Sequence, residues 1–290
     1  MKRFVLYNPK SGDRAGKSVA KRLEEFLQGC ELIYVDMTEI VNYDTFFSQI
    51  SESDEIYICG GDGTLNRYIN QTIGIDYKNK VYYYAAGSGN DLANDLGIEP
   101  YSKPIKIDEY IASLPIVTVK GETYRFINGV GLGVDGYVCA EKSRIREENN
   151  KKEGYIMVAL KALFKDYKPT KATVTVDGVT AAYDRVWMAS VMKGRFFGGG
   201  MKIAPTQNRF DEEGLVTSLV AHNLSKLKIL CLFLLIFKGN HIKYVKHVAL
   251  KKCKEVKVEF DKPAVIQIDG ETISDVLGYT VSVPVTAKTQ

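Results

Sequence analysis

The chain has few of the features that mark secreted, metal-rich or membrane-spanning proteins. Its five cysteines include no CxxC pair, so neither a disulfide framework nor a zinc site is indicated and a reducing cytoplasm is favoured. The formal charge of +4 is too small to indicate nucleic acid binding. The strongest apolar stretch, 11 residues from Leu227 to Phe237, is about half as long as a membrane-spanning helix needs to be. The apolar run from Phe4 to Tyr7 is too short for an export signal.

Residues 3 to 114 alternate between short apolar runs and helical patterns. We expect strands at four of these runs: Phe4–Tyr7, Leu32–Val35, Ile56–Cys59 and Val81–Tyr84. Helical patterns at Lys17–Leu27 and Phe46–Ile50 lie between them. This alternation predicts a parallel sheet with flanking helices, in which ligands bind at the carboxyl ends of the strands.

After Pro115 the pattern becomes β-rich, with short alternating runs and Asp-Gly turns. We expect strands at Ile116–Val119, Ala172–Val176, Arg185–Val191, Glu255–Phe260, Ala264–Ile268 and Tyr279–Val283, and helices around Ala140–Phe164 and Leu224–Lys238. Such strands are typical of an antiparallel sandwich or barrel. The sequence therefore predicts two domains, an α/β nucleotide-binding domain over residues 1–115 and a β-rich domain over residues 116–290.

Glycine-containing segments follow three of the predicted strands in the first domain. Asn8 to Gly12 offers N–H groups, a hydroxyl and a lysine charge to phosphate oxygens, although the same residues also form ordinary turns. Gly60 to Asn66 carries one charge, Asp62; a carboxylate beside a triphosphate is repelled unless a cation lies between them, which suggests Mg²⁺. The alternative is a strand-to-helix turn with Asp62 as the N-cap. Gly87 to Asp91 repeats the design one strand later.

A further pair of carboxylates, Asp269 and Glu271, flanks Gly270 in the β-rich part. Taken alone, this segment predicts a hairpin turn, because Asp-Gly is the favoured type I′ pair. A hairpin tip that reached a bound nucleotide would bring two carboxylates near the γ-phosphate. One would accept a proton, and the other would help to order metal and water.

These segments, together with Gly198 to Pro205, occur in the order found in the diacylglycerol kinase catalytic-domain family, and the resemblance covers nearly the whole chain. The Gly60 to Thr64 motif alone is shared with NAD kinases and phosphofructokinases, so the later segments carry the specificity. The resemblance implies an NAD-kinase-like α/β N-terminal domain and a β-sandwich C-terminal domain, with ATP between them. It also implies Mg²⁺-dependent transfer of the γ-phosphate of ATP to a lipid hydroxyl. Diacylglycerol is the default substrate and phosphatidic acid the product, as in phospholipid biosynthesis.

The resemblance assigns roles residue by residue. Nucleotide contacts fall on Asn8, Pro9, Lys10, Ser11, Gly12, Thr38, Gly61, Asp62, Gly63, Thr64, Leu65, Asn66 and Ser88. The catalytic Mg²⁺ and its waters would be held by Asp62, Asp91 and Glu271, and the base for the lipid hydroxyl would be Asp269, followed by Glu271. A second, structural Mg²⁺ would bind the side chain of Glu213 and the carbonyls of Phe210 and Leu215. Glu213 stands where the family usually has Asp, Ser88 where Thr is usual, and Arg67 where Glu is common.

A lysine-rich segment follows the apolar stretch, with seven lysines against one acid between Lys238 and Lys257. It predicts peripheral contact with an anionic membrane at its inner face, and the alternative is a solvated rim beside a core helix. Two other functions stay open, an NAD kinase and a lipid- or nucleotide-binding protein without turnover. The intact acidic residues argue against the second. The sequence names neither the lipid alcohol nor the oligomeric state, for which a homodimer is one option.

Overall fold

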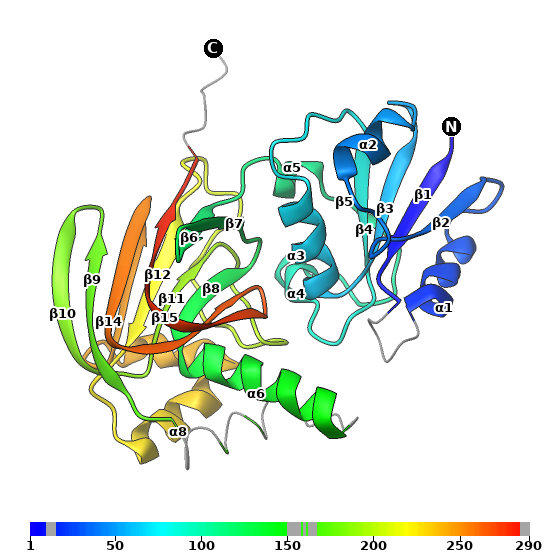
Figure 1. The fold of residues 1–290 in the computed structure, drawn as a ribbon. Helices are drawn as coiled ribbons and strands as arrows, with labels where there is room; N and C mark the ends of the chain where they lie inside the picture. Colours follow the sequence, from blue (N-terminus) through cyan, green and yellow to red (C-terminus); the bar gives the residue numbers. More distant parts are fainter. Residues whose placement is uncertain (10–15, 150–157, 159–160, 162–166, 285–290) are drawn as a thin grey trace. The chain divides into compact units, whose positions relative to one another are not determined.

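The computed structural model describes residues 1–9, 16–149, 158, 161 and 167–284. The chain divides into two compact units, Met1–Ser113 and Leu114–Gln290, coloured from blue to green and from green to red in Figure 1. Each unit contains one β-sheet. The two sheets differ in the direction of their strands, and we describe each unit by itself.

The first unit is built on a five-stranded sheet in the order β2-β1-β3-β4-β5. Its strands are β1 (Arg3–Tyr7), β2 (Leu32–Asp36), β3 (Glu55–Gly60), β4 (Lys80–Ala85) and β5 (Ile105–Lys106). Strands β1 to β4 pair in parallel, and β5 runs antiparallel to β4. The helices are α1 (Gly16–Lys21), α2 (Tyr43–Ser48), α3 (Asp62–Gln71), α4 (Asp91–Leu96) and α5 (Asp108–Ile111), with a 3-10 helix η1 (Arg22–Glu25) after α1.

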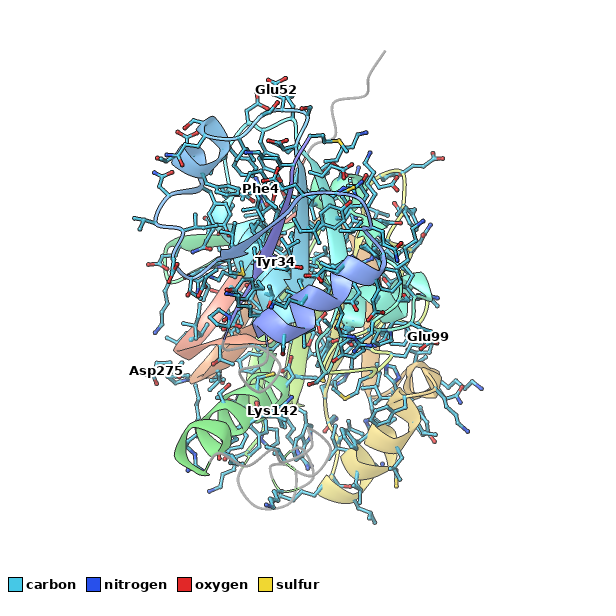
Figure 2. All side chains as sticks on the ribbon, turned by 90° about the vertical axis from the view of Figure 1, so that its right-hand side faces the viewer. Phe4, Tyr34, Glu52, Glu99, Lys142 and Asp275 are labelled. Carbon is cyan, nitrogen blue, oxygen red and sulfur yellow. The ribbon has the colours of Figure 1, made fainter. Side chains whose placement is uncertain are left out.

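The central strand β3 is buried along its whole length, as expected for a parallel strand covered on both faces. Aromatic rings fill the space around the sheet. Phe4 of β1, labelled in Figure 2, meets Phe46 of α2 edge-on at 5.7 Å, and Tyr57 of β3 stacks on Tyr82 of β4 at 4.7 Å. This packed sheet fixes the positions of the loops at its carboxyl edge, and it confirms the predicted α/β class.

The second unit contains a sheet of ten strands whose pairings are antiparallel. Its main path runs β13-β12-β11-β8-β14-β15-β6-β7, and β9 joins β10 to β14. The strands are β6 (Ile116–Val119), β7 (Glu122–Arg125), β8 (Gly129–Gly133), β9 (Thr170–Val176), β10 (Val179–Val186), β11 (Met188–Met192), β12 (Val216–Ala221), β13 (Val248–Cys253), β14 (Glu255–Ile268) and β15 (Glu271–Ser282).

The long strand β14 turns this sheet into a sandwich. Its first half pairs with β9 and its second half with β8, with a shift of register after Glu259. One strand therefore belongs to two layers, and the layers enclose a core that includes Phe126, Leu132, Phe260 and Tyr279. The predicted antiparallel β-sandwich is confirmed.

Two helices, α6 (Val134–Asn149) and α8 (Lys226–Ile236), lie along one side of the β-rich unit, and a 3-10 helix η3 (Asn240–Lys243) follows α8 (Figure 1). They pack over a second apolar cluster that includes Val138, Trp187 and Phe233. Along the described residues, no helix combines the length and the apolar character needed to cross a bilayer.

Several predicted boundaries in this unit are wrong. The single strand expected over Arg185–Val191 is broken at Trp187, whose backbone N–H donates to the Ala221 carbonyl as the chain passes from β10 to β11. The two strands expected over Glu255–Phe260 and Ala264–Ile268 are one bent strand. Strands β7, β8, β12 and β13 were not predicted. Part of the expected Ala140–Phe164 helix lies outside the described residues.

Candidate active site

The turn after β3 carries the first predicted segment. Strand β3 ends at Gly60, and Gly61 is the N-cap of α3, whose first residue is Asp62. The expectation that Asp62 itself caps the helix is therefore wrong, because the chain turns one residue earlier. The Gly61 carbonyl accepts the N–H groups of Thr64 and Leu65 at 3.0 and 3.1 Å. The amino end of this ten-residue helix is thus a place where an anion is favoured.

The turn after β4 packs directly against the first. A Cβ atom placed on Gly87 would lie 2.3 Å from the Gly61 Cα atom, so the two backbones meet where only glycine fits. Asn90 closes the second turn, because its side chain accepts from the Gly87 N–H at 2.8 Å and donates to the Gly87 carbonyl at 2.7 Å. Asn90 has a positive φ of 51°, and Ser88 is exposed at the tip of the turn.

Asp62 and Asp91 are brought together by these two turns. The backbone N–H of Asp91, the first residue of α4, donates to Asp62 Oδ1 at 2.8 Å. Burial, together with the nearby charges of Asp62 and Asp91, raises the pKa of the Tyr83 hydroxyl beneath them well above its usual range. Two carboxylates at neighbouring helix starts fit a divalent cation that also touches phosphate. Over the described residues, His, Cys, Asp and Glu side chains do not gather in groups of three or more that could hold a metal alone.

The other predicted nucleotide residues lie at the same sheet edge, and some of them face inward. Asn8 follows β1 and Thr38 follows β2; the Thr38 hydroxyl donates to Asp36 Oδ1 at 2.7 Å. Leu65 is fully buried and Thr64 nearly so, and the backbone N–H groups of both donate to the Gly61 carbonyl. The predicted contacts Lys10, Ser11 and Gly12 lie outside the described residues.

Asp269 lies in a two-residue hairpin turn between β14 and β15. Asp269 and Gly270 have positive φ angles of 48° and 95°, and Ile268 pairs with Glu271 across the turn, as the Asp-Gly pair predicts. The carboxylate of Asp269 is buried and accepts three backbone N–H groups, from Ile127 at 2.7 Å, Asn128 at 2.8 Å and Gly129 at 2.9 Å. Glu271 is exposed.

The segment that binds Asp269 is itself held by a buried arginine that the sequence analysis missed. The Arg209 guanidinium donates to the Ile127 carbonyl and, at 3.1 Å, to Asn128 Oδ1. Arg209 belongs to the same loop as the predicted structural magnesium ligands. No local pattern indicates this contact, because more than 80 residues separate its partners.

A second group that the sequence analysis missed is Asp135, near the start of α6. It is buried, borders an apolar cavity of about 70 Å³ between the sandwich and α8, and has the Ser190 hydroxyl 3.4 Å away. Apolar residues of α8, among them Leu232 and Phe233, form the far wall of the cavity. Burial raises the pKa of Asp135 to about 6, against the stabilising effect of neighbouring amides and of the Gln267 and Ser190 side chains.

The chain thus consists of an α/β unit with two interlocked glycine turns, followed by an antiparallel sandwich. Comparison with family models agrees: residues 2–118 match the diacylglycerol kinase catalytic domain, and residues 128–287 match the YegS C-terminal NAD kinase beta sandwich-like domain. The chain belongs to the diacylglycerol kinase catalytic-domain family, and it is a kinase that uses ATP as its phosphate donor.

Individual relatives give the same picture. A diacylglycerol kinase of Mycobacterium tuberculosis is 27% identical over 240 residues, covering 78% of this chain and 75% of its own. A diacylglycerol kinase of Bacillus subtilis is 24% identical over 278 residues, covering 92% and 88%. Among solved structures, a chain from Bacillus anthracis has a TM-score of 0.68 at 18% identity and covers 98% of this chain and 92% of its own, which shows a shared fold.

Proposed function

We propose that this protein transfers the γ-phosphate of ATP to the hydroxyl group of a lipid, with diacylglycerol as the first expected substrate and phosphatidic acid as the product. The observation that carries the proposal is the pairing of Asp62 with Asp91 at the carboxyl edge of the first sheet, joined by the 2.8 Å hydrogen bond. The relatives named diacylglycerol kinase support the choice of substrate class.

The nucleotide would be held mainly by backbone groups of the first unit. Backbone N–H groups point outward from the amino end of a helix and suit a phosphate, as at the start of α3, and the exposed Ser88 hydroxyl adds a donor. Asn8 and Thr38, at the ends of β1 and β2, follow the same sheet edge. We assign Asn8 to Gly12 to the phosphates as well, on the resemblance of that segment to the family.

Asp62 and Asp91 would hold the catalytic Mg²⁺, with Glu271 as a further ligand through water. The ion would neutralise charge on the β- and γ-phosphates, and the protein would position the phosphates and the hydroxyl. Asp62 Oδ1 accepts the Asp91 N–H at 2.8 Å, and an ionised carboxylate has further acceptor positions on its two oxygens. This hydrogen bond fixes the direction of the Asp62 side chain before ligand binding.

Asp269 would orient the lipid hydroxyl and accept its proton, with Glu271 as the second choice. The three N–H donors hold the Asp269 carboxylate in one orientation, from which it would accept a hydrogen bond from the lipid hydroxyl. In phosphoryl transfer, bond breaking to the leaving group runs ahead of attack, so little basicity is required of this carboxylate. The positioning of the hydroxyl then matters more than the strength of the base.

The apolar cavity beside α8 supports a lipid as the acceptor. Its walls are mostly apolar, with Asp135 and His241 as the titratable side chains among them, and the Asp135 carboxylate would accept a hydrogen bond from a lipid hydroxyl. A cavity of about 70 Å³ is too small for a complete acyl chain. Binding therefore requires α8 to move outward, and α8 is well placed for that because it lies at the surface.

The outer face of α8 supports contact with a membrane. Leu227 and Leu234 are 69% and 65% exposed, and nearby Tyr244 and Val245 are also exposed. Exposed lysines surround them: Lys228, Lys238, Lys243 and Lys246. Lysines further along the predicted basic segment do not contribute, because Lys252, Lys254 and Lys257 lie near acidic partners on the sandwich. We propose that this α8 surface binds the anionic inner face of the membrane and that the lipid enters past α8.

A phosphotransfer assay tests the proposal. The purified protein is incubated with radiolabelled ATP, Mg²⁺ and a panel that contains diacylglycerol, monoacylglycerol, phosphatidylglycerol, a long-chain base and NAD. Label in a lipid product supports the proposal and names the lipid. Label in NAD alone would make the protein an NAD kinase, and binding of ATP or lipid without transfer to any compound would leave a non-catalytic binding protein.

A further inference from the structure

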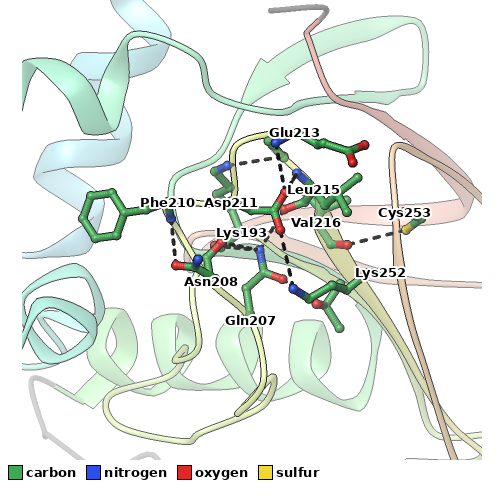
Figure 3. Close-up of polar contacts among 12 residues, drawn as sticks. Lys193, Gln207, Asn208, Phe210, Asp211, Glu213, Leu215, Val216, Lys252 and Cys253 are labelled. Carbon is green, nitrogen blue, oxygen red and sulfur yellow. Dashed lines mark hydrogen bonds and ion pairs between the residues drawn. The ribbon is translucent and has the colours of Figure 1, made fainter.

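The loop from Gln207 to Leu215 is where the family resemblance implies a structural Mg²⁺, and its groups do not fit that ion. The Leu215 carbonyl accepts the Gln207 side-chain amide at 2.8 Å. The Glu213 carboxylate, 67% exposed, lies 3.1 Å from the Lys254 ammonium. Figure 3 shows the side chains of Phe210 and Glu213 pointing away from each other. Mg²⁺ requires oxygen ligands in near-octahedral geometry, and here the Glu213 carboxylate faces Lys254 and the Leu215 carbonyl accepts an amide.

Lysines and one acid hold the loop instead (Figure 3). Asp211 Oδ1 accepts the backbone N–H groups of Glu213 at 3.1 Å and Leu215 at 3.4 Å, while Asp211 Oδ2 lies 3.5 Å from the Lys252 ammonium. From the interior, the Lys193 ammonium donates to the Gly214 carbonyl at 3.3 Å. Lys193 is only 6% exposed, and the contact is partly buried.

We infer that this chain closes the 207–215 loop with lysine side chains in place of a divalent cation, so that the loop is formed without Mg²⁺. The charges agree with this inference. Asp211 lies near Lys252 and Glu213 near Lys254, and Lys193 adds a third positive charge at the Gly214 carbonyl. A divalent ion added among them would meet the repulsion of the nearby ammonium groups, and it would share the Leu215 carbonyl with the Gln207 amide.

The loop matters beyond its own residues because it carries Arg209. The Arg209 guanidinium holds the Ile127 carbonyl and the Asn128 side chain, and the N–H groups of the same segment bind Asp269. The lysine closure therefore supports the position of Asp269 through one intervening segment. In this chain, that support is present whether or not Mg²⁺ is available. The inference concerns the folded protein and does not depend on which compound is phosphorylated.

Thermal unfolding in the absence of nucleotide tests the inference, because the single tryptophan, Trp187, is buried in the same unit and reports its unfolding. We expect the same Tm in EDTA and in excess Mg²⁺. Lys193→Met should lower the Tm by about 4–8 °C, since the partly buried Gly214 carbonyl loses its charged donor. Lys252 is partly exposed, so Lys252→Met should lower the Tm by a smaller amount. This variant tests the inference if Lys193→Met does not fold. Lys257→Met is the matched control: it removes a lysine from a surface ion pair on β14 and should shift the Tm by less than about 2 °C.

A titration with Mn²⁺ in the absence of nucleotide measures directly whether the loop binds a divalent cation. Mn²⁺ binding that Glu213→Gln abolishes would overturn the inference, and so would a Tm effect of both Lys193→Met and Lys252→Met no larger than that of Lys257→Met. Glu213 is exposed, so its replacement does not threaten folding. Mn²⁺ binding that Glu213→Gln leaves intact but Asp62→Asn removes belongs to the first unit and agrees with a metal-free loop.

Discussion

The substitution Asp269→Asn should unfold the β-rich unit more easily as well as impair catalysis. In the wild-type protein the carboxylate accepts three buried N–H groups. Asparagine keeps one oxygen, which can still accept from Asn128 and Gly129, but it turns an NH₂ group toward the Ile127 N–H. One charge-assisted hydrogen bond is lost and two donors face each other without an acceptor. From typical values for such groups, the cost is about 2–4 kcal/mol of unfolding free energy.

Urea unfolding followed by Trp187 fluorescence measures this cost in the relevant unit. With a slope of about 2 kcal/mol per molar, the midpoint should fall by about 1–2 M. Glu271→Gln is the matched control two residues away; Glu271 is exposed, so its midpoint should stay within about 0.3 M of wild type. An Asp269→Asn protein that unfolds at the wild-type midpoint would refute the structural part of this reasoning, and loss of activity in that variant would then be purely catalytic.

Three further predictions follow from the site. Asp62→Asn keeps an oxygen for the Asp91 N–H, so circular dichroism should show a folded protein, whereas phosphotransfer should fall by about 10²-fold or more because the charge is lost. Asp135 has a folded pKa of about 6 against its ordinary 3.8, so the folded state holds a proton that the unfolded state releases, and the free energy of unfolding falls between about pH 4 and pH 7. Asp135→Asn should remove up to about 3 kcal/mol of that fall, measured by urea unfolding at several pH values; equal pH dependence in both proteins would contradict the buried-acid assignment. Leu234→Asp should weaken co-sedimentation with anionic vesicles, whereas Val179→Asp, a similarly exposed position on β10, should not; equal effects would remove the α8 surface from the proposal.

The first unit could be predicted from the sequence because its parallel strands are buried on both faces and therefore appear as continuous apolar runs. Several strands of the second unit could not be predicted from the sequence. Strand β8 contains three glycines in five residues, and at Gly131 a Cβ atom would lie 1.8 Å from Asp135 Oδ2, so packing rather than strand propensity selects the residue. Strand β13 contains adjacent lysines, which suggested a basic surface segment instead of a strand.

Some features of the candidate site could likewise be predicted from the sequence, and others could not. Parallel strands place their following loops at one edge, so the approach of Asp62 to Asp91 could be expected from two similar motifs one strand apart. The anchoring of Asp269 could not, because its three N–H partners lie about 140 residues away in a segment without a motif. The buried position of Asp135 also depends on tertiary packing that local sequence does not encode.

The central claim is that acids of the first unit direct the γ-phosphate of ATP to a lipid hydroxyl. The most direct measurement compares phosphate transfer to the best lipid of the panel, presented in anionic vesicles with Mg²⁺, by the wild-type protein, Asp62→Asn and the exposed control Asp76→Asn. The account predicts a labelled lipid product from the wild type and from Asp76→Asn, and almost none from Asp62→Asn. Full transfer by folded Asp62→Asn, or wild-type transfer to NAD and to no lipid, would contradict it.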